Sequence, residues 1–346
     1  MGPMVPPRQQ AVGRTDGSLS SNRYPLKTGN LFFLFRFQYP LGYMLSVMEA
    51  LQWANARLRE NAEPRFDSPM LDAEVLLAAV LDIPKAKLFL RGTSILQPQD
   101  FERFRALVER RAAREPVAYI LGRKEFYGRP FSVNRFTLVP RPATETLVEA
   151  AIVAARTTDP AFTILADVGT GSGAIAVTLA AETGLPVVAS DVSRHALAVA
   201  RANAETLRVA ERVDFRQGEG LEPLARLFHT IRMERDRLPF SHLVLCANLP
   251  YLPDARWGDL QGDIRRHEPR LALTSGPDGL ADYWKLFRDL KEKRALFPSV
   301  VTALIEIDPD QTEAATAMVR HRFPSADVTV HKDLAGHDRV LVARNL

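Results

Sequence analysis

The sequence predicts an α/β fold in which a mostly parallel sheet carries helices on both faces and is preceded by a small helical domain. Two observations favour the sheet. From Thr144 onward, short apolar runs alternate with segments of helical periodicity, as in strands joined by crossover helices. A glycine-rich turn follows the apolar run 163–168 directly, as where a strand turns sharply into a helix. The third observation, apolar residues at three-to-four spacing from Ser46 to Arg114, predicts the helical domain.

The first helix is expected to begin after Ser46, because Ser46 and Glu49 have the spacing of a capping box. Apolar residues then recur at helical spacing in three stretches: Met48, Leu51 and Leu58; Leu71–Leu81 after Ser68-Pro69; and Phe101, Phe104, Leu107 and Val108. An aromatic stripe at this spacing is most often core, and we interpret it so. The exposed remainder of the domain is a candidate docking face for a partner.

The segment after the helical domain, residues 115–141, alternates apolar residues with glycines and prolines and predicts a hairpin linker. Further on we expect a helix that ends at Arg156, strands at 163–168, 187–190, 213–217, 243–247, 300–307, 327–331 and 339–343, and helices at 174–182, 194–207, 282–296 and 311–321. The last two strands should form an antiparallel hairpin that closes the sheet, and the charged segment 225–240 is interpreted as an exposed loop or helix.

The turn after strand 163–168 has the sequence Gly169, Thr170, Gly171, Ser172, Gly173. Glycines let a ligand approach the backbone closely, and the start of the following helix offers free N–H groups. The next strand ends at Asp191, 22 residues after Gly169, where a carboxylate can accept both hydroxyls of a ribose. The turn lacks the Lys-Ser/Thr ending of a phosphate-binding loop, so a triphosphate is not expected.

The tetrapeptide Asn248-Leu249-Pro250-Tyr251 follows the apolar run 243–247. The Asn248 side-chain oxygen and the Leu249 carbonyl can each accept one hydrogen of a planar NH2 group, while Pro250 fixes the turn and Tyr251 offers a stacking face. An isolated motif of this kind is usually a turn. Together with the glycine turn and Asp191 at neighbouring strand ends, it indicates a site that orients an amide or amine toward an electrophile.

These motifs resemble those of the HemK/PrmC family of S-adenosylmethionine-dependent methyltransferases, over about residues 46–346. Beyond the glycine turn, Asp191 and the Asn248 tetrapeptide, the resemblance rests on Glu115–Gly122, Glu125–Gly128, Leu138–Glu145, His267–Leu273 and Gly276–Leu280. Three positions depart from the family pattern. Leu249 replaces a usual proline, Ala143 replaces a usual glutamate, and Gly218-Glu219-Gly220 stands where an aspartate and a bulky residue are more common.

The resemblance implies a class I, Rossmann-like methyltransferase with a seven-stranded sheet whose last strand is antiparallel. It implies methyl transfer from S-adenosylmethionine to the glutamine of the Gly-Gly-Gln loop of class 1 peptide chain release factors. Asn248 and Tyr251 are the expected catalytic residues, and Asn248, Leu249, Pro250 and Tyr251 are expected to bind the substrate. The expected cofactor-binding residues are Gly169, Thr170, Gly171, Ser172, Gly173, Asp191, Glu219 and Asn248.

Two other substrates fit the same motifs. A glutamine of a ribosomal protein is the closer alternative, and only the helical domain would distinguish it. The exocyclic amine of adenine in a nucleic acid is the second, since it is also a planar NH2 group. A module that binds the cofactor without catalysis is a further alternative, which Asn248 and Tyr251 disfavour. Glu306, at the end of strand 300–307, either borders the site or is a buried hydrogen-bonded carboxylate.

Charge and composition narrow the choice of partners. Of the 346 residues, 46% are hydrophobic and 25% charged, an ordinary globular composition. Residues 1–47 hold five basic side chains and one acidic, whereas the other 299 residues hold 40 of each, so no basic excess points to nucleic acid. The single cysteine, Cys246, excludes an internal disulfide, and the scattered histidines indicate no metal site. We therefore expect a protein substrate and a monomeric enzyme.

Four segments are expected: a tail at 1–43, a helical substrate-recognition domain at 44–114, the hairpin linker at 115–141 and the catalytic domain at 142–346. The apolar run in the tail is interrupted by Arg36 and Pro40 and is too short to span a membrane. The tail is either a mitochondrial presequence or sequence upstream of a true start at Met44 or Met48. The expected location is therefore the cytoplasm, with the mitochondrial matrix as the alternative.

Overall fold

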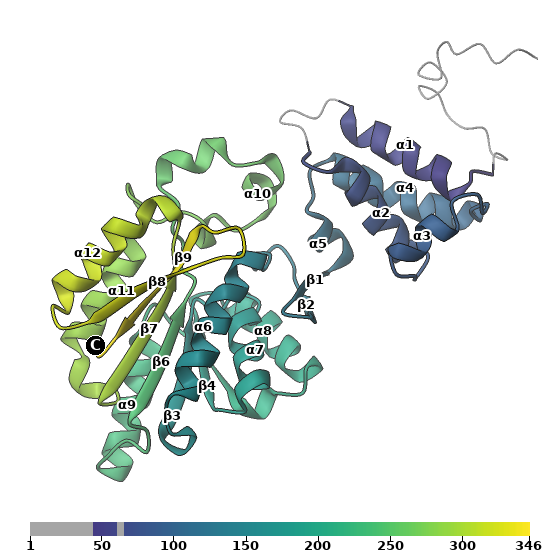
Figure 1. Cartoon of the computed structure of the whole chain (residues 1–346). Coiled ribbons are helices and arrows are strands. Elements are labelled where there is room, and N and C mark those ends of the chain that lie inside the picture. Colours follow the sequence, from purple (N-terminus) through teal and green to yellow (C-terminus); the bar gives the residue numbers. More distant parts are fainter. Residues whose placement is uncertain (1–43, 61–65) are drawn as a thin grey trace, which may run out of the picture. The chain divides into compact units, whose positions relative to one another are not determined.

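The computed structural model describes residues 44–60 and 66–346. The expectations for residues 1–43 lie outside this range. The helical part contains α1 (Val47–Arg59), α2 (Pro69–Val80), α3 (Ala86–Leu90), α4 (Pro98–Ala112) and α5 (Val117–Leu121) (Figure 1). The expectation of a hairpin over 115–141 is wrong for α5, whose Ile120 is buried in the core of the helical part. The predicted capping box is present, because the Ser46 hydroxyl accepts from the Glu49 backbone N–H and the Glu49 carboxylate accepts from that of Ser46. Phe104 and Val108 are buried in the core between these helices, as the pattern predicted.

A two-stranded hairpin follows, formed by β1 (Arg123–Phe126) and β2 (Arg129–Ser132). Tyr127 and Gly128 join the strands with positive φ values, as a two-residue type I′ turn requires. Phe126 and Phe131 meet edge to face, with ring centroids 6.0 Å apart, and both are buried in the core of the α/β part. Asn203 holds the hairpin to the α/β part, since its side chain bonds both the N–H and the carbonyl of Ser132.

The main sheet has seven strands: β3 (Thr163–Val168), β4 (Val187–Asp191), β5 (Val213–Gln217), β6 (His242–Ala247), β7 (Val300–Glu306), β8 (Asp327–Lys332) and β9 (Asp338–Arg344). Their spatial order is β5-β4-β3-β6-β7-β9-β8. The first five strands of that order are parallel, and β9 lies antiparallel between β7 and β8. This topology confirms the predicted fold class.

Helices cover both faces of the sheet (Figure 1). One face packs against α6 (Glu145–Arg156), α7 (Ala174–Thr183) and α8 (Arg194–Thr206), and the other against α9 (Glu222–Arg235), α11 (Ala281–Glu292) and α12 (Thr312–Arg322). Alternate residues of β3 enter the two cores: Ile164 and Ala166 enter one and Leu165 the other. A strand buried on both faces reads as a continuous apolar run, which is why its pattern was recognisable.

The charged segment 225–240 is only partly exposed. Residues up to Arg235 belong to α9, whose Phe228 is fully buried against Phe297, with ring centroids 5.7 Å apart. The expectation of an exposed insertion is therefore wrong for the apolar side of this helix. The high density of arginines hid an amphipathic stripe that Leu224 and Phe228 supply.

The chain reverses its winding direction at β3, since it proceeds outward from β3 through β4 to β5 and then returns to β6 on the other side. Ligands bind at such a switch point in open α/β sheets, beyond the carboxyl ends of the strands. The glycine turn follows β3, Asp191 ends β4, and Asn248 follows β6. The topology thus brings the three predicted motifs to one edge of the sheet.

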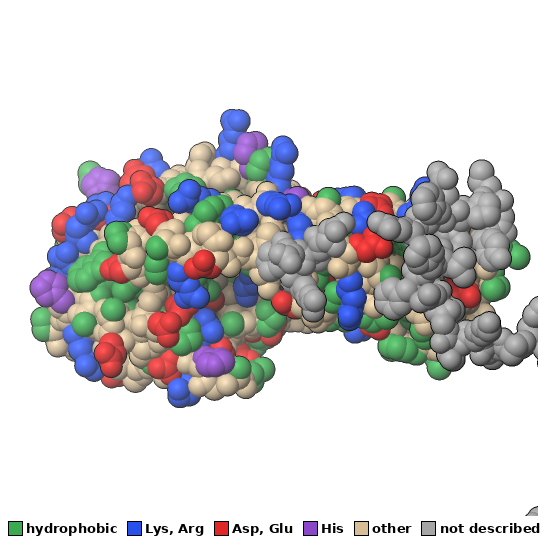
Figure 2. Space-filling view, turned by 90° about the horizontal axis from the view of Figure 1, so that it is seen from above, with side chains coloured by type: hydrophobic (Ala, Val, Ile, Leu, Met, Phe, Trp, Pro, Cys, Tyr) green, Lys and Arg blue, Asp and Glu red, His purple; other side chains and the backbone are tan. Residues whose placement is uncertain are grey.

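Within residues 44–60 and 66–346, no helix is long and apolar enough to cross a membrane. Basic and acidic side chains are intermixed over the face shown in Figure 2. This distribution agrees with the balanced charge count of residues 48–346.

Candidate active site

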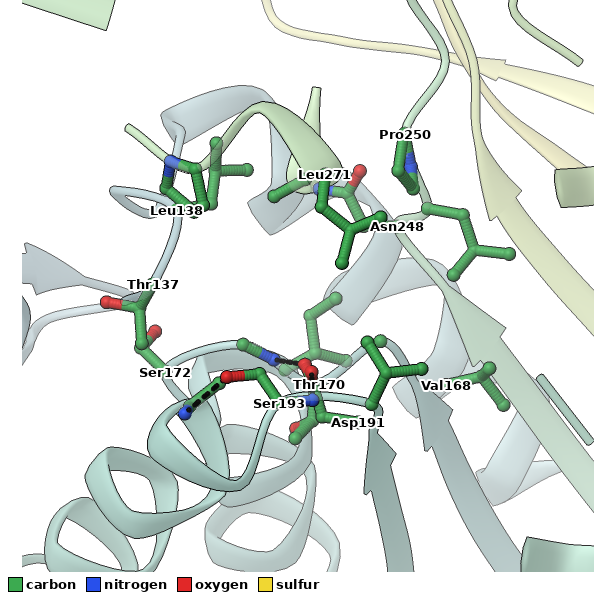
Figure 3. Close-up of a pocket in the computed structure, with 18 of the residues that line it drawn as sticks. Thr137, Leu138, Val168, Thr170, Ser172, Asp191, Ser193, Asn248, Pro250 and Leu271 are labelled. Carbon is green, nitrogen blue, oxygen red and sulfur yellow. Dashed lines mark hydrogen bonds between the residues drawn. The ribbon is translucent and has the colours of Figure 1, made fainter. Parts of the chain in front are cut away.

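A cavity of about 330 Å³ lies at the carboxyl ends of β3, β4 and β6 (Figure 3). Thr170, Ser172 and Asp191 line it on one side, and Asn248 and Pro250 line it on the other. The linker contributes Phe136 to Leu138, and the segment before α11 contributes Leu271. Several separate parts of the chain therefore enclose a space large enough for a small-molecule ligand.

The glycine turn requires glycine at its two ends. Gly169 has a φ of +78°, and a Cβ there would lie 2.8 Å from the Leu249 side chain. Gly173 has a φ of +82°, and a Cβ there would lie 3.0 Å from the Cβ of Ala200. Both positions combine a left-handed backbone with close packing, so any side chain would displace the turn. Gly171 has open space instead, which leaves its backbone accessible from the cavity.

Asp167, the next-to-last residue of β3, stabilises the glycine turn through two hydrogen bonds. Its Oδ2 accepts from the Thr170 hydroxyl at 2.6 Å and from the Ala176 N–H at 3.2 Å. Oδ1 has no hydrogen-bond partner in the described part of the chain. Burial raises the pKa of Asp167 to about 7, because a charged carboxylate is poorly solvated there. The Thr170 side chain thus fixes the turn, although the residue also lines the cavity.

Asp191 connects the ends of β3 and β4. Its Oδ2 accepts from the Gly171 N–H at 2.9 Å, and its Oδ1 accepts from the Ser193 N–H at 2.8 Å. Burial raises its pKa, while these backbone bonds oppose the rise. A carboxylate has about four acceptor positions, so both oxygens can still accept a bond from a ligand. This geometry suits a pair of adjacent hydroxyls.

Asn248 follows the last residue of β6, and two side chains hold its amide nitrogen by hydrogen bonds. Its Nδ2 donates to Glu306 Oε2 at 2.9 Å and to the Thr144 hydroxyl at 3.1 Å. Glu306 and Thr144 are 1% and 4% exposed, so these partners are fixed by packing. Because the nitrogen is engaged by both, the side-chain oxygen Oδ1 is left to accept a bond from another molecule.

Leu249 and Tyr251 of the tetrapeptide are held by hydrogen bonds to Tyr283, Gln311 and Glu306. The Leu249 N–H donates to the Tyr283 hydroxyl at 3.2 Å, and the Tyr251 carbonyl accepts from Gln311 Nε2 at 2.7 Å. The Tyr251 hydroxyl donates to Glu306 Oε1 at 3.2 Å. Burial, with the nearby Glu306 as a smaller cause, raises the pKa of Tyr251 above its usual range. Tyr251 therefore stays neutral and serves as a donor.

A second cavity, of about 180 Å³, adjoins the first. Four residues line both: Leu138, Arg141, Asn248 and Ala272. Tyr251 lines only the second cavity, together with Leu252, Leu260, Ile264 and Leu273. Asn248 consequently lies where two spaces meet, one bordered by the glycine turn and the other by Tyr251.

Glu219, the predicted residue at the far end of the first cavity, lines it next to Gly218 and Gly220. Its carboxylate forms an ion pair with Lys285, which also lines the cavity. Its side chain is 66% exposed, so it lies at the rim rather than in the interior. All the predicted cofactor-binding residues except Gly173 line this cavity, and Gly173 is the N-cap of α7, whose first two residues line it.

Glu268 was not singled out by the sequence reasoning, yet it shapes the cavity wall. Its carboxylate, 2% exposed, accepts from the Val139 N–H at 3.1 Å and from Arg141 at 2.6 Å. It follows α10 (Gly262–His267), whose Asp263 binds the buried Arg111 of α4 at 3.2 Å. The sequence carried no signal for this role, because the burial that makes the carboxylate need partners is seen only in the structure. Thr144 lies in the family-like stretch Leu138–Glu145, and no sequence pattern indicates its bond to Asn248.

No group of His, Cys, Asp or Glu side chains able to hold a metal occurs in residues 44–60 and 66–346. Cys246 is buried in β6. The polar groups that line the two cavities are hydroxyls, amides, carboxylates, backbone groups and the cationic side chains of Arg135, Arg141 and Lys285. Such a site can bind, orient and stabilise charge.

Comparison with known proteins places these features in a family. The model of the PrmC N-terminal domain matches residues 49–122, and a methyltransferase domain model matches residues 165–267. The chain is 35% identical to the release factor glutamine methyltransferase of Rhodopirellula baltica, over 86% of this chain and 95% of that protein. It is 36% identical to the Bacillus subtilis protein of that name, over 87% and 98% of the two chains, and 38% identical to the Nitratidesulfovibrio vulgaris protein, over 85% and 93%. With matches of this length on top of the shared motifs and topology, the chain belongs to the release factor glutamine methyltransferase family.

Proposed function

We propose that this protein transfers a methyl group from S-adenosylmethionine to the side-chain amide nitrogen of a glutamine in a peptide chain release factor. One observation carries the proposal: Asn248 stands where the two cavities meet, with its amide nitrogen held by Glu306 and its oxygen free to accept. An acceptor in this position suits a planar carboxamide. The names of the relatives supply the substrate class.

The first cavity fits the cofactor by its own features. The backbone at Gly171 is open to the cavity, and the glycines at 169 and 173 keep side chains out of the turn. Asp191 would accept from the ribose hydroxyls, and the predominantly apolar walls suit the uncharged adenine. When bound there, S-adenosylmethionine supplies an activated methyl group on a sulfonium.

The second cavity suits the glutamine side chain. Leu138, Tyr251 and Ala272 provide apolar walls for its methylene groups, and Asn248 provides the acceptor at the junction. Two acceptors, Asn248 Oδ1 and the Leu249 carbonyl, would then bind the two hydrogens of the substrate NH2 group. The lone pair, which is delocalised in a free amide, is thereby directed toward the first cavity.

The chemistry follows from what these two oxygens do as the reaction proceeds. The substrate nitrogen gains positive charge as it forms its new bond, so its hydrogens become stronger donors. The bonds to Asn248 and Leu249 therefore strengthen in the transition state, which raises turnover rather than binding alone. The remaining rate enhancement would come from positioning, because both reactants are held in adjoining cavities. The extra proton leaves to water afterwards.

The proposal is tested by incubating the purified protein with S-adenosylmethionine and a recombinant class 1 release factor, followed by mass spectrometry of the Gly-Gly-Gln peptide. The expected result is one added methyl group on the glutamine. A release factor with Gln replaced by Glu in that loop is the matched control and should stay unmodified. Parallel reactions with ribosomal proteins and with adenine-containing RNA and DNA complete the test. Methylation of one of these, with none on the release factor, would contradict the proposal.

A further inference from the structure

The side-chain amide of Asn248 can adopt two orientations of nearly the same shape, which exchange Oδ1 and Nδ2. Only one of them can accept a hydrogen bond from the substrate. With Oδ1 toward the second cavity, Asn248 accepts from a substrate NH2 group. With Nδ2 there, two donors would face each other. The Thr144 hydroxyl cannot select between them by itself, because a hydroxyl can both donate and accept. Its own hydrogen bond to Glu306 leaves its oxygen to accept from Asn248. An ionised Glu306 can select, since a carboxylate only accepts.

Glu306 is held firmly enough to make this selection. It is the last residue of β7, and the register of β6 with β7 pairs Ala247 with Ile305, so Asn248 and Glu306 follow side by side. The Glu306 carboxylate is 1% exposed and accepts from Asn248 on one oxygen and from Tyr251 on the other. Its backbone carbonyl accepts from Tyr283 at 2.6 Å.

The charge of Glu306 is not cancelled by a close partner. In the ranges that the structure describes, no Lys, Arg or His nitrogen lies within 4.0 Å of the carboxylate, and its hydrogen-bond donors are neutral. A carboxylate bonded to Nδ2 pulls the amide hydrogens toward itself and increases the negative charge on Oδ1. Asn248 then becomes a stronger acceptor for a nitrogen that is turning positive.

We propose that Glu306 is a positioning residue, which fixes the Asn248 amide with its oxygen toward the substrate nitrogen and strengthens that oxygen as an acceptor. The proposal deepens the proposed function and rests on it for the nature of the substrate. Glu306 does not touch the reacting atoms, and acts through Asn248.

Acid should therefore lower turnover through Glu306. Burial raises the pKa of this carboxyl, and its protonated form would donate a hydrogen bond and favour the flipped amide. The groups that face Glu306 are Tyr251 and Tyr283, whose pKa values are themselves raised by burial, and the more distant Arg141 and Arg339, which favour the charged form. The raised pKa values keep both tyrosines neutral, so we expect Glu306 to be the group of this cluster that titrates on the acid side.

The central experiment compares Glu306→Gln with the wild type in release factor methylation. Glutamine has the same shape but can present either oxygen or nitrogen to Asn248, so we expect kcat to fall about tenfold. KM for the release factor and the affinity for S-adenosylhomocysteine, measured by calorimetry, should stay within about twofold. The acid limb of the kcat profile should disappear in the variant. Asp289→Asn, which changes another buried carboxylate on α11 away from the cavities, is the matched control and should keep all values.

A double-mutant cycle separates positioning from a general structural role. If Glu306 acts through Asn248, Glu306→Gln should have no further effect on kcat in an Asn248→Ala background. Independent, multiplying losses would overturn the proposal, and so would a Glu306→Gln enzyme with wild-type kcat and an unchanged acid limb. Should Glu306→Gln fold poorly, Tyr251→Phe removes the bond to the other oxygen and should give a smaller loss of kcat with the acid limb retained.

Failure of this inference is distinguishable from failure of the proposed function. If the wild type does not methylate the release factor, the proposed function fails before any variant is compared. If the wild type methylates it and the variants behave as the wild type does, only the role of Glu306 fails.

Discussion

The two halves of the site are built differently. The half that borders the glycine turn is assembled from backbone of two adjacent strands, and Asp167 and Asp191 fix it through bonds within 20 residues of sequence. The half around Asn248 depends on Thr144 and Glu306, which lie 104 and 58 residues away along the chain. A turn that is bonded locally can be recognised from its own sequence. The orientation of Asn248 is set by side chains far away in the sequence, so its role cannot be recognised from the local sequence. A substitution at one of these distant positions could therefore abolish that role.

The largest expected effect separates the two halves directly. Asn248→Ala removes the acceptor and should lower kcat by about 10²- to 10³-fold, the loss typical of a deleted charge-stabilising group. Affinity for S-adenosylhomocysteine, measured by calorimetry, should stay within about threefold, because the glycine turn and Asp191 are unchanged. Equal losses in turnover and cofactor affinity would show that the halves are not independent.

The second effect is a pH dependence of the unfolding free energy, and it arises from Asp167 next to the glycine turn. The pKa of Asp167 is raised to about 7 in the folded protein, far above that of an aspartate in an unfolded chain. The folded state therefore binds the proton more tightly. The stability gained in this way is fully present below about pH 4, where the unfolded aspartate is protonated too, and is lost as the pH rises to about 7. Urea unfolding of the wild type should show a free energy that declines from pH 5 to 7.5 by an amount on the order of a few kcal/mol. Asp167→Asn should flatten this decline, and an identical slope in the variant would remove Asp167 as its cause.

A third, smaller effect tests the cofactor role of Asp191. Replacement by alanine removes a charged acceptor, and bonds of that kind contribute about 1.5–3 kcal/mol, or roughly a ten- to hundredfold weaker binding of S-adenosylhomocysteine. Turnover at saturating cofactor should change much less. Asp214→Ala, which removes an exposed carboxylate of β5 paired with Arg216, is the control and should bind normally. The assignment is wrong if both variants bind the cofactor equally well.

The smallest effect is expected at Leu249, where the family usually has proline. Leu249→Pro keeps the backbone carbonyl but removes the N–H that donates to Tyr283 at 3.2 Å. We expect a loss of no more than roughly 1 kcal/mol in unfolding free energy and turnover within about twofold of the wild type. A large loss of turnover would mean that the acceptor half also depends on this bond.

Much of the fold was predictable because the local signals agreed with the tertiary structure. The strand 163–168 is an unbroken apolar run that is buried on both faces, and the Ser46 capping box marks the start of α1. The prediction that segment 225–240 is exposed was wrong in part, because its four arginines obscured the apolar stripe around Phe228.

The candidate site was predictable to the extent that it follows strand ends. Parallel strands end at one edge of the sheet, so Gly169, Asp191 and Asn248 had to come together once the topology was known. The partners of Asn248 were not predictable in the same way. Thr144 precedes a helix and Glu306 ends a strand that pairs with β6, and no sequence spacing indicates that their side chains meet.

The short helix α10 has a consequence for how the protein could be altered. On one side Asp263 is bound to Arg111 of α4, and just beyond its end Glu268 is bound to Val139 and Arg141 in the cavity wall. A chimaera that exchanged residues 44–114 for those of a relative would have to preserve a basic side chain at position 111, or the ion pair between this position and Asp263 would be lost. The helical part and the catalytic part are thus constrained to diverge together.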